Sequence, residues 1–377
     1  MYESTSFDIK RLIMNILRHH ILQYVFGWAI SFALVSCSTI SNPVDPKPEQ
    51  GMAYRKLLKE LDWGTDTCYI YGHKTPDVDA ATSALSMATL MRALGYNCKA
   101  KVSSATNRES AYIAGLFGFA LPELKPSVQP DTRLILTDHT DYAQCVDGAH
   151  EAIILQKIDH HVEGDIADAG IPYVRREMVG STNTIIYQMY KELGVVIADE
   201  TARIMLAGIL SDTRNLSKST TQCIDSTAWL ALTTQLGLTA DSVAIISKGM
   251  EDASSDYSGM TDTEIFLSDY KDYEIGSHLI GIGSLDIKMD EAEAFIDSML
   301  AVMPEVLTMM NRQMLFAKIG MTDANGTYFI YYGKGAQAVA EAIFGPSVRE
   351  GVTFTEQELS RKQIVPLIND VLNINKI

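Results

Sequence analysis

Four short clusters of aspartate and histidine recur along this chain, and each follows an apolar run. Carboxylate and imidazole ligands without a thiolate suit a hard or borderline divalent cation such as Mn²⁺ or Mg²⁺, rather than a structural zinc ion. One such cluster would be weak evidence, but four in similar contexts predict a common metal centre. In chain order, the clusters are His73-Lys74-Thr75-Pro76-Asp77-Val78-Asp79, Asp138-His139, Asp159-His160-His161 and Ser211-Asp212.

The apolar runs indicate how the fold brings these clusters together. Short apolar runs that end in polar residues are typical of buried parallel strands, which present side chains at their carboxyl ends. Open α/β sheets build their sites at that edge. The runs cover residues 68–71, 134–136, 153–155 and 204–210. The last also fits an apolar helix over 201–210, with Asp212 following the helix.

The remaining elements predict an α/β protein of two domains. Helices over 80–94 and 182–193, the second capped by Ser181, alternate with strands such as 98–102, which indicates a doubly wound parallel sheet. Residues 248–258 turn polar and are predicted to link the domains. Beyond them, β-rich segments at 278–287 and 315–333, a hairpin turn at Asn325-Gly326, and helices over 290–302 and 336–344 predict a smaller mixed α/β domain.

With these motifs placed, the chain resembles the DHH phosphoesterases and, within them, the manganese-dependent family II inorganic pyrophosphatases. The resemblance runs from about residue 67 to about 366, and Ser360-Arg361-Lys362 is similar to the family's C-terminal signature, although one residue shorter. Related exopolyphosphatases carry Asn where this chain has His73. The Gly-Gly-Gly-His run of DHH enzymes that act on oligonucleotides is missing from the sequence.

The resemblance implies a DHH metal-binding domain over 52–247, a linker over 248–258 and a DHHA2-like substrate-binding domain over 259–377, with the active site in the cleft between them. It implies that pyrophosphate is hydrolysed to two phosphates by a hydroxide bridging two Mn²⁺ ions, with Mg²⁺ or Co²⁺ as alternatives. A homodimer is left open.

The resemblance also assigns residues to roles. It implies that His161, Arg361 and Lys362 are catalytic and bind substrate. Asp159 would orient a histidine by a hydrogen bond. His139 would either support a metal ligand from behind, as Asp159 does, or contact the substrate. The implied ligands are His73, Asp77 and Asp138 for one metal, and Asp79, Asp138, His160 and Asp212 for the other.

One departure from the family concerns a substrate-binding lysine just after the linker, because an ungapped alignment places Met260 at that position. This departure leaves three alternatives. Another cation binds the substrate in place of the lysine, the affinity for pyrophosphate is lower, or the substrate differs. The alternative functions are therefore another DHH-type phosphohydrolase, acting on short polyphosphate or a nucleotide-derived phosphate ester, and a lipid-anchored binding protein with decayed activity.

The length and net charge of the chain limit the kinds of partner that it can bind. The 377 residues suffice for about two domains with full cores. A net charge of −16 argues against nucleic acid, whose binding requires a basic surface. An acidic protein that handles an anionic substrate must concentrate positive charge locally, and metal ions together with Arg361 and Lys362 would do so.

The N-terminal residues 1–37 predict a bacterial lipoprotein signal. Residues 21–35 are almost uninterruptedly apolar, basic residues precede them, and Leu34-Val35-Ser36-Cys37 resembles a lipobox. Residues 38–51 would be a polar tether behind a lipidated Cys37, which would anchor the protein to a membrane outside the cytoplasm. Met14 is a candidate start of that signal. The alternative is a cytoplasmic enzyme that begins at Met52.

Overall fold

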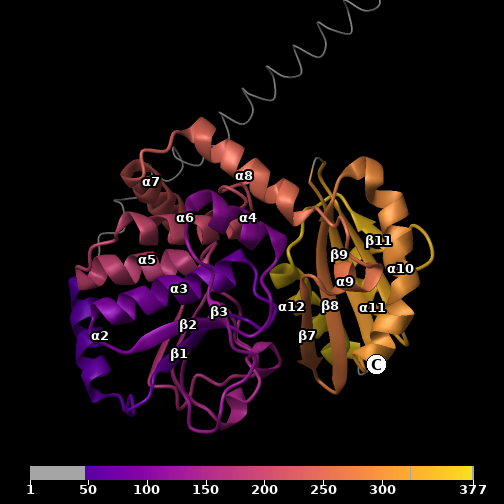
Figure 1. Cartoon of the computed structure of the whole chain (residues 1–377). Helices are drawn as coiled ribbons and strands as arrows, with labels where there is room; N and C mark the ends of the chain where they lie inside the picture. Colours follow the sequence, from indigo (N-terminus) through magenta and orange to yellow (C-terminus); the bar gives the residue numbers. More distant parts are fainter. Residues whose placement is uncertain (1–46, 323, 376–377) are drawn as a thin grey trace, which may run out of the picture.

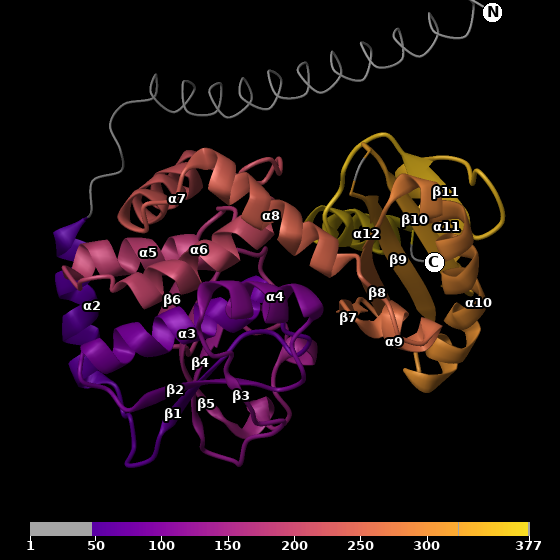
Figure 2. The same ribbon diagram turned by 45° about the horizontal axis from the view of Figure 1, so that its top comes forward.

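The structure, a computed structural model, describes residues 47–322 and 324–375, which form two sheets with their own helices (Figure 1). Helix α8 (Ala240–Ser254) leaves the first unit and leads into the second, as two views show (Figures 1 and 2). The predicted lipoprotein segment of residues 1–37 lies outside the described residues. Among those that are described, no single helix has the length and apolarity needed to cross a bilayer, and one pair that passes on composition is bent by 110°.

The first sheet has six parallel strands in the order β3-β2-β1-β4-β5-β6. The order reverses between β1 and β4, and open α/β sheets place ligands at such a switch point, outside the carboxyl ends of the strands. The strands are β1 (Cys68–Tyr71), β2 (Cys98–Val102), β3 (Glu123–Leu124), β4 (Arg133–Thr137), β5 (Ile153–Asp159) and β6 (Tyr173–Arg176).

Helices cover one face of this sheet and bury a large apolar core against it, while two 3₁₀ turns and their loops cover the other face in a smaller core. The predicted parallel α/β domain is thus confirmed. The helices are α2 (Pro48–Glu60), α3 (Val78–Ala93), α4 (Arg108–Phe117), α5 (Thr182–Leu193), α6 (Asp199–Thr213), α7 (Cys223–Gln235) and α8; the 3₁₀ turns are η1 (Tyr142–Gln144) and η2 (Ala149–Glu151).

Two local predictions differ from the structure. Residues 204–210 form part of helix α6 rather than a strand, and the helix runs on to Thr213, so Asp212 lies in its last turn instead of after it. The predicted linker 248–258 is helical as far as Ser254, because α8 is capped by Thr239 and anchored by the buried side chains of Val243 and Met250. Only the short stretch after Ser254 lacks regular structure before α9 (Asp262–Leu267).

The second sheet has five strands in the order β11-β10-β9-β8-β7, mixed in direction because β8 and β9 run parallel while the other pairs are antiparallel. Helices α9 and α10 bury one face, and α11 and α12 bury the other. The strands are β7 (Tyr270–Ile275), β8 (His278–Ile287), β9 (Met314–Met321), β10 (Thr327–Gly333) and β11 (Val352–Thr355). The helices are α9, α10 (Ala292–Met309, after the 3₁₀ turn η3, Met289–Glu291), α11 (Ala336–Phe344) and α12 (Arg361–Asn375).

Gly72 lies at the junction between β1 and the first ligand cluster, and a substitution there tests how tightly this junction is packed. It lies between β1 and His73, and a Cβ added there would come within 2.4 Å of the carbonyl oxygen of Ala80 on α3. The obstacle is backbone that cannot rotate away, so we expect Gly72→Ala to destabilise the protein by about 1–3 kcal/mol, the usual cost of overpacking.

Thermal unfolding of Gly72→Ala and of a matched control variant tests this prediction. Gly115→Ala is the control, because Gly115 is a helical residue with open space around it and should lose nothing or gain up to about 1 kcal/mol. Equal melting temperatures for the two variants would contradict the proposed tight contact between β1 and α3.

Candidate metal centre

Three of the four predicted clusters meet at the carboxyl ends of neighbouring parallel strands. His73 follows β1, Asp138 directly follows β4, and Asp159 ends β5 just before His160. Asp212 reaches the same place from the last turn of α6. Because β1 and β4 flank the switch point, these side chains share one edge of the sheet.

The side chains form overlapping groups whose ligand atoms lie within 4.8 Å of one another. Asp138 belongs to every group, as expected of a carboxylate that serves two cations. The groups are His73, Asp77 and Asp138; Asp79, Asp138, His160 and Asp212; and Asp138, His160 and His161.

The backbone aims Asp138 into this cluster. Its φ of 62° lies in the left-handed region, which side-chain-bearing residues avoid but which Asp tolerates better than most. Its amide donates to the carbonyl of Ile158 at 3.0 Å, and its carboxylate accepts from the Thr182 hydroxyl at 3.1 Å. Strain held in place by such contacts is typical of functional sites.

Asp79 is fully buried and held by the amino end of α5. Its carboxylate accepts from the Ser181 hydroxyl at 2.6 Å, the Thr182 amide at 2.7 Å and the Asn183 side-chain amide at 2.8 Å. Burial, followed by the charges of Asp138 and Asp212, nevertheless raises the pKa of Asp79 to about 8. Carboxylates this close need a cation among them in order to be ionised together.

Two of the three histidines in the ligand groups, His73 and His160, fit a cation. His73 is almost completely buried, yet both of its ring nitrogens lack a hydrogen-bond partner in the described chain. Its Nε2 lies 3.2 Å from Asp77 and 3.6 Å from Asp138. The Nδ1–H of His160 donates to the carbonyl of Val179 at 3.0 Å, which orients its Nε2 toward the cluster. The donor set of imidazoles and carboxylates therefore suits a divalent metal such as Mn²⁺.

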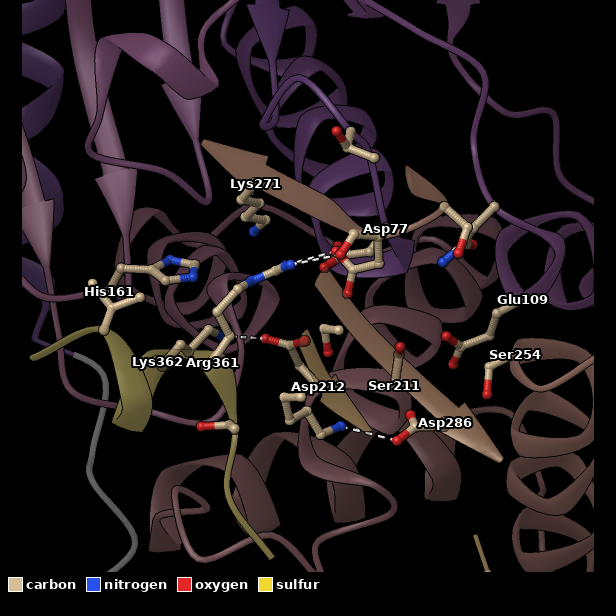
Figure 3. A pocket seen from close by; sticks show the side chains of 18 of the residues that line it. Asp77, Glu109, His161, Ser211, Asp212, Ser254, Lys271, Asp286, Arg361 and Lys362 are labelled. Carbon is tan, nitrogen blue, oxygen red and sulfur yellow. Dashed lines mark hydrogen bonds and ion pairs between the residues drawn. The ribbon is translucent and has the colours of Figure 1, made fainter. Parts of the chain in front are cut away.

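His161, the third histidine of the ligand groups, points into the cavity (Figure 3). Its backbone N–H and its Nδ1–H both donate to Asp159, each at 2.8 Å, so Asp159 orients a histidine as predicted. Burial, helped by Lys362, lowers the pKa of His161 to about 4, which leaves the ring neutral near pH 7 in the substrate-free protein. An anionic substrate would raise that pKa.

His139 lines the cavity, but both of its ring nitrogens contact groups outside the ligand cluster. Its Nδ1 lies 2.8 Å from the carbonyl oxygen of Thr137, and its Nε2 lies 3.2 Å from Sγ of Cys145. Within the part of the chain that the structure describes, His139 makes no hydrogen bond to a ligand-group side chain. The geometry thus gives no support to the prediction that it orients a ligand.

The second domain closes over this centre and contributes positive charge. The two domains enclose a cavity of about 1210 Å³, and both predicted cations, Arg361 and Lys362, line it from the start of α12 (Figure 3). The Arg361 guanidinium donates to the carboxylate and carbonyl of Asp269, at 2.6 and 2.7 Å, and to the carbonyl of Ile282 at 3.2 Å. These bonds fix its position and leave further N–H groups for a ligand.

Lys362 contacts the second ligand group directly. Its ammonium is 2.7 Å from Asp212 and 2.5 Å from Nε2 of His160. The same Nε2 lies 3.1 Å from both Asp138 and Asp212, whose hydrogen bonds raise the pKa of His160 to about 10 against the opposing effects of burial and Lys362. Whichever group carries the proton, a positive charge sits where the second ligand group converges.

Lys271 is the cation that the sequence analysis missed. It lies on β7, is buried, and lines the cavity (Figure 3). Burial and then Arg361 lower its pKa, while the carboxylates of Asp77 and Asp138 oppose that shift, so its ammonium faces the first ligand group. Met260 instead packs against the core of the second domain at the cavity wall. Lys271 lies eleven residues after Met260 and supplies a buried positive charge to the cavity where Met260 does not.

Comparisons with known proteins agree with this architecture. Residues 67–209 match the family model described as "DHH family, N-terminal domain", and residues 248–371 match the "DHHA2 domain". The chain is 32% identical to the manganese-dependent inorganic pyrophosphatase of Methanothrix thermoacetophila, over 80% of this chain and 97% of that protein. It is 29% identical to the one from Bacillus subtilis, over 80% and 98%. A crystal structure from Methanococcus jannaschii, assigned to the family II inorganic pyrophosphatases, superimposes with a TM-score of 0.73 at 25% identity, covering 81% of this chain and 99% of that one.

The buried carboxyls predict how the stability of the metal-free protein depends on pH. Burial raises the pKa values of Asp79 and of Glu109, another acid of the cavity, to about 8 in the fold, whereas the unfolded chain releases these protons near pH 4. Between about pH 6.5 and about pH 8 the unfolded state therefore binds fewer protons, so these groups make the fold less stable as pH rises.

We expect the melting temperature of protein stripped of metal with a chelator to fall between those two pH values. Mn²⁺ should reduce the fall, because a cation stabilises the ionised carboxylates. Asp79→Asn should flatten the dependence in the metal-free protein. A metal-free melting temperature that stays constant or rises over this range would show that Asp79 is already ionised without a cation.

Proposed function

The chain belongs to the family of manganese-dependent inorganic pyrophosphatases built from a DHH and a DHHA2 domain, and we propose that it hydrolyses inorganic pyrophosphate to two phosphates with Mn²⁺ at the Asp138 cluster. The observation that carries this proposal is the meeting of two ligand groups at Asp138 beneath cations from the second domain. Phosphoryl transfer depends chiefly on positioning and on neutralising charge, and this cleft is equipped for both.

The proposed metal ligands fall into two sets that share one carboxylate. Two ions would explain why one buried aspartate serves both groups, as in other hydrolases that hold two cations with a bridging ligand. When bound, the metals would supply Lewis acidity and an activated water nucleophile. One set is His73, Asp77 and Asp138, and the other is Asp79, Asp138, His160 and Asp212.

Residues of both domains then act on the substrate. Arg361 and Lys271 lie on the side of Asp77 and would neutralise phosphate oxygens there, with Arg361 held in place by Asp269. Lys362 would exchange its contact with Asp212 for one with phosphate. His161, oriented by Asp159, would contact the substrate through Nε2 and, once the substrate has raised its pKa, donate a proton to the departing phosphate.

The alternatives remain open to experiment. The cavity is larger than the usual range of about 300–1,000 Å³ for a drug-sized ligand, which leaves space for a longer phosphate chain. In each ligand group the ligand atoms lie within 4.8 Å of one another, so the set of metal ligands is complete. This completeness argues against a binding protein with decayed activity. A homodimer stays a prediction.

Phosphate release by the purified protein tests the proposed function. With Mn²⁺ we expect two phosphates for each pyrophosphate, and a higher kcat/KM for pyrophosphate than for tripolyphosphate or a nucleotide monophosphate. Asp138→Ala should abolish activity and lower the Mn²⁺ content from about two ions per chain to less than one, because both sets lose a ligand.

Elemental analysis supplies the second readout. Thr182→Val is a milder control, since it removes only the hydroxyl that donates to Asp138 and should keep both ions. An Asp138→Ala protein that still binds two ions would contradict the shared ligand. A preference for tripolyphosphate over pyrophosphate would favour the alternative phosphohydrolase.

We further propose that Cys37 is lipidated, which rests on the sequence of residues 1–51: basic residues, an apolar run, the lipobox of residues 34–37 and a polar tether. Processing would leave Cys37 as the new N-terminus with acyl chains, and more than one chain is needed for stable anchoring. Mass spectrometry of the native N-terminus should find a lipid-modified Cys37, and Cys37→Ser should accumulate a larger, unprocessed precursor in the membrane fraction. A native protein that begins near Met52 in the soluble fraction would contradict this proposal and favour a cytoplasmic enzyme.

A further inference from the structure

Three further cations line the cavity on the side of Asp212, and two of them are already neutralised. Asp286 on β8 accepts from the Arg214 guanidinium and from the Lys318 ammonium, both at 2.9 Å. The other arm of Arg214 donates to Glu358. Both contacts of Arg214 cross the cleft, because Arg214 belongs to the first domain and Asp286 and Glu358 belong to the second, whereas Lys318 pairs with Asp286 within the second domain.

The third cation, Lys218, has no such partner. Among residues 47–322 and 324–375, its ammonium makes no ion pair and no side-chain hydrogen bond, although it lines the cavity. It lies close enough to Asp212 to help Lys362 and His160 hold the pKa of that carboxyl below its usual range against the effect of burial. A partly buried ammonium without a counter-ion is costly, which suits a group that awaits an anion.

Glu109, another acid that lines the cavity, does not neutralise Lys218. Glu109 faces the same part of the cavity from α4, beside Ser211 and Ser254 (Figure 3). Burial raises the pKa of Glu109 to about 8, so it is mostly protonated near neutral pH. The positive charge of Lys218 is thus left available on the side of the cavity that adjoins the second ligand group.

The loop that carries Lys218 is constrained in an uncommon backbone conformation. Arg214, Asn215 and Leu216 have φ angles of 44°, 50° and 68°, all in the left-handed region that side-chain-bearing residues avoid. The amide of Lys218 donates to the carbonyl of Thr213 at 3.0 Å and closes the turn.

Contact with the second domain adds to this constraint. The Gln363 side chain, next to Lys362 on α12, donates to the Ser219 hydroxyl at 3.3 Å. The turn after α6 is therefore fixed at both ends. It places Lys218 at the wall of the cavity, on the same side of the cavity as Lys362.

We propose that Lys218 is a further substrate-binding residue, whose ammonium binds an oxygen of the phosphate that lies on the Asp212 side of the metal centre. This inference rests on the proposed function and deepens it. Lys271 and Arg361 bind the substrate on the Asp77 side of the metal centre. Lys218 and Lys362 bind it on the Asp212 side. The Asp286 pairs keep Arg214 and Lys318 from competing for the same anion.

Kinetics of matched variants test this role. Lys218→Met removes the charge at nearly constant length, and we expect kcat/KM for pyrophosphate to fall by about 10²-fold, as on loss of one positioned charge contact. Lys218→Arg keeps the charge and should retain activity within about tenfold of wild type. Lys334→Met is the control, because Lys334 is an exposed lysine outside the cavity and should change nothing.

Binding of inorganic phosphate separates substrate binding from a structural role. In calorimetric titration of the Mn²⁺-loaded proteins, Lys218→Met should weaken phosphate binding at least tenfold, while its metal content stays at the wild-type value and its melting temperature does not fall. Lys218→Gln repeats the charge loss should the Met variant fold poorly.

Two results would overturn the inference. One is phosphate affinity and kcat/KM within about twofold of wild type in Lys218→Met; the other is loss of Mn²⁺ in that variant, which would assign Lys218 to the metal site. A wild-type protein that fails to hydrolyse pyrophosphate would instead contradict the proposed function, and phosphate titration would still decide the role of Lys218.

Discussion

Repulsion among buried carboxylates is the constraint on which the rest of the structure depends. Asp77, Asp79, Asp138 and Asp212 converge at one edge of the parallel sheet, and burial opposes the ionisation of each. A protein tolerates such a cluster only if positive charge is supplied to it. The first domain supplies imidazoles, the second supplies Lys271 and Lys362, and the ligand geometry is suited to divalent cations.

Closure of the second domain follows from the same constraint. The domains touch through the Thr75 hydroxyl, which donates to the carbonyl of Tyr270 at 3.0 Å, and through Arg214, which pairs with Asp286 at 2.9 Å. The Lys362 contact with Asp212 lies between them, at the centre of the cleft. The cleft is thus closed by polar contacts around the charged cluster rather than by an apolar interface, so an anionic substrate and its metals can alter the balance that holds the domains together.

Much of the site could be predicted from the sequence because parallel strands share their carboxyl edge. The positions of Asp77, Asp138 and His160 follow from the strand ends that precede them, and the structure brings them together as expected. Lys271 could not be found in this way, because its role depends on how the second domain docks and not on any local pattern. For His139 the sequence left two roles open, support of a ligand or contact with substrate, and the left-handed backbone at Asp138 sends the His139 ring toward the carbonyl of Thr137 rather than toward a ligand.

The central claim is that Asp138 is shared by two metal ions. Anomalous diffraction at the manganese edge, from crystals of the Mn²⁺-loaded protein, tests it directly. The account predicts two peaks about 3.5–4 Å apart, with one Asp138 oxygen bound to each ion or a single oxygen bound to both. A single peak at saturating Mn²⁺, or a second peak without contact to Asp138, would contradict it.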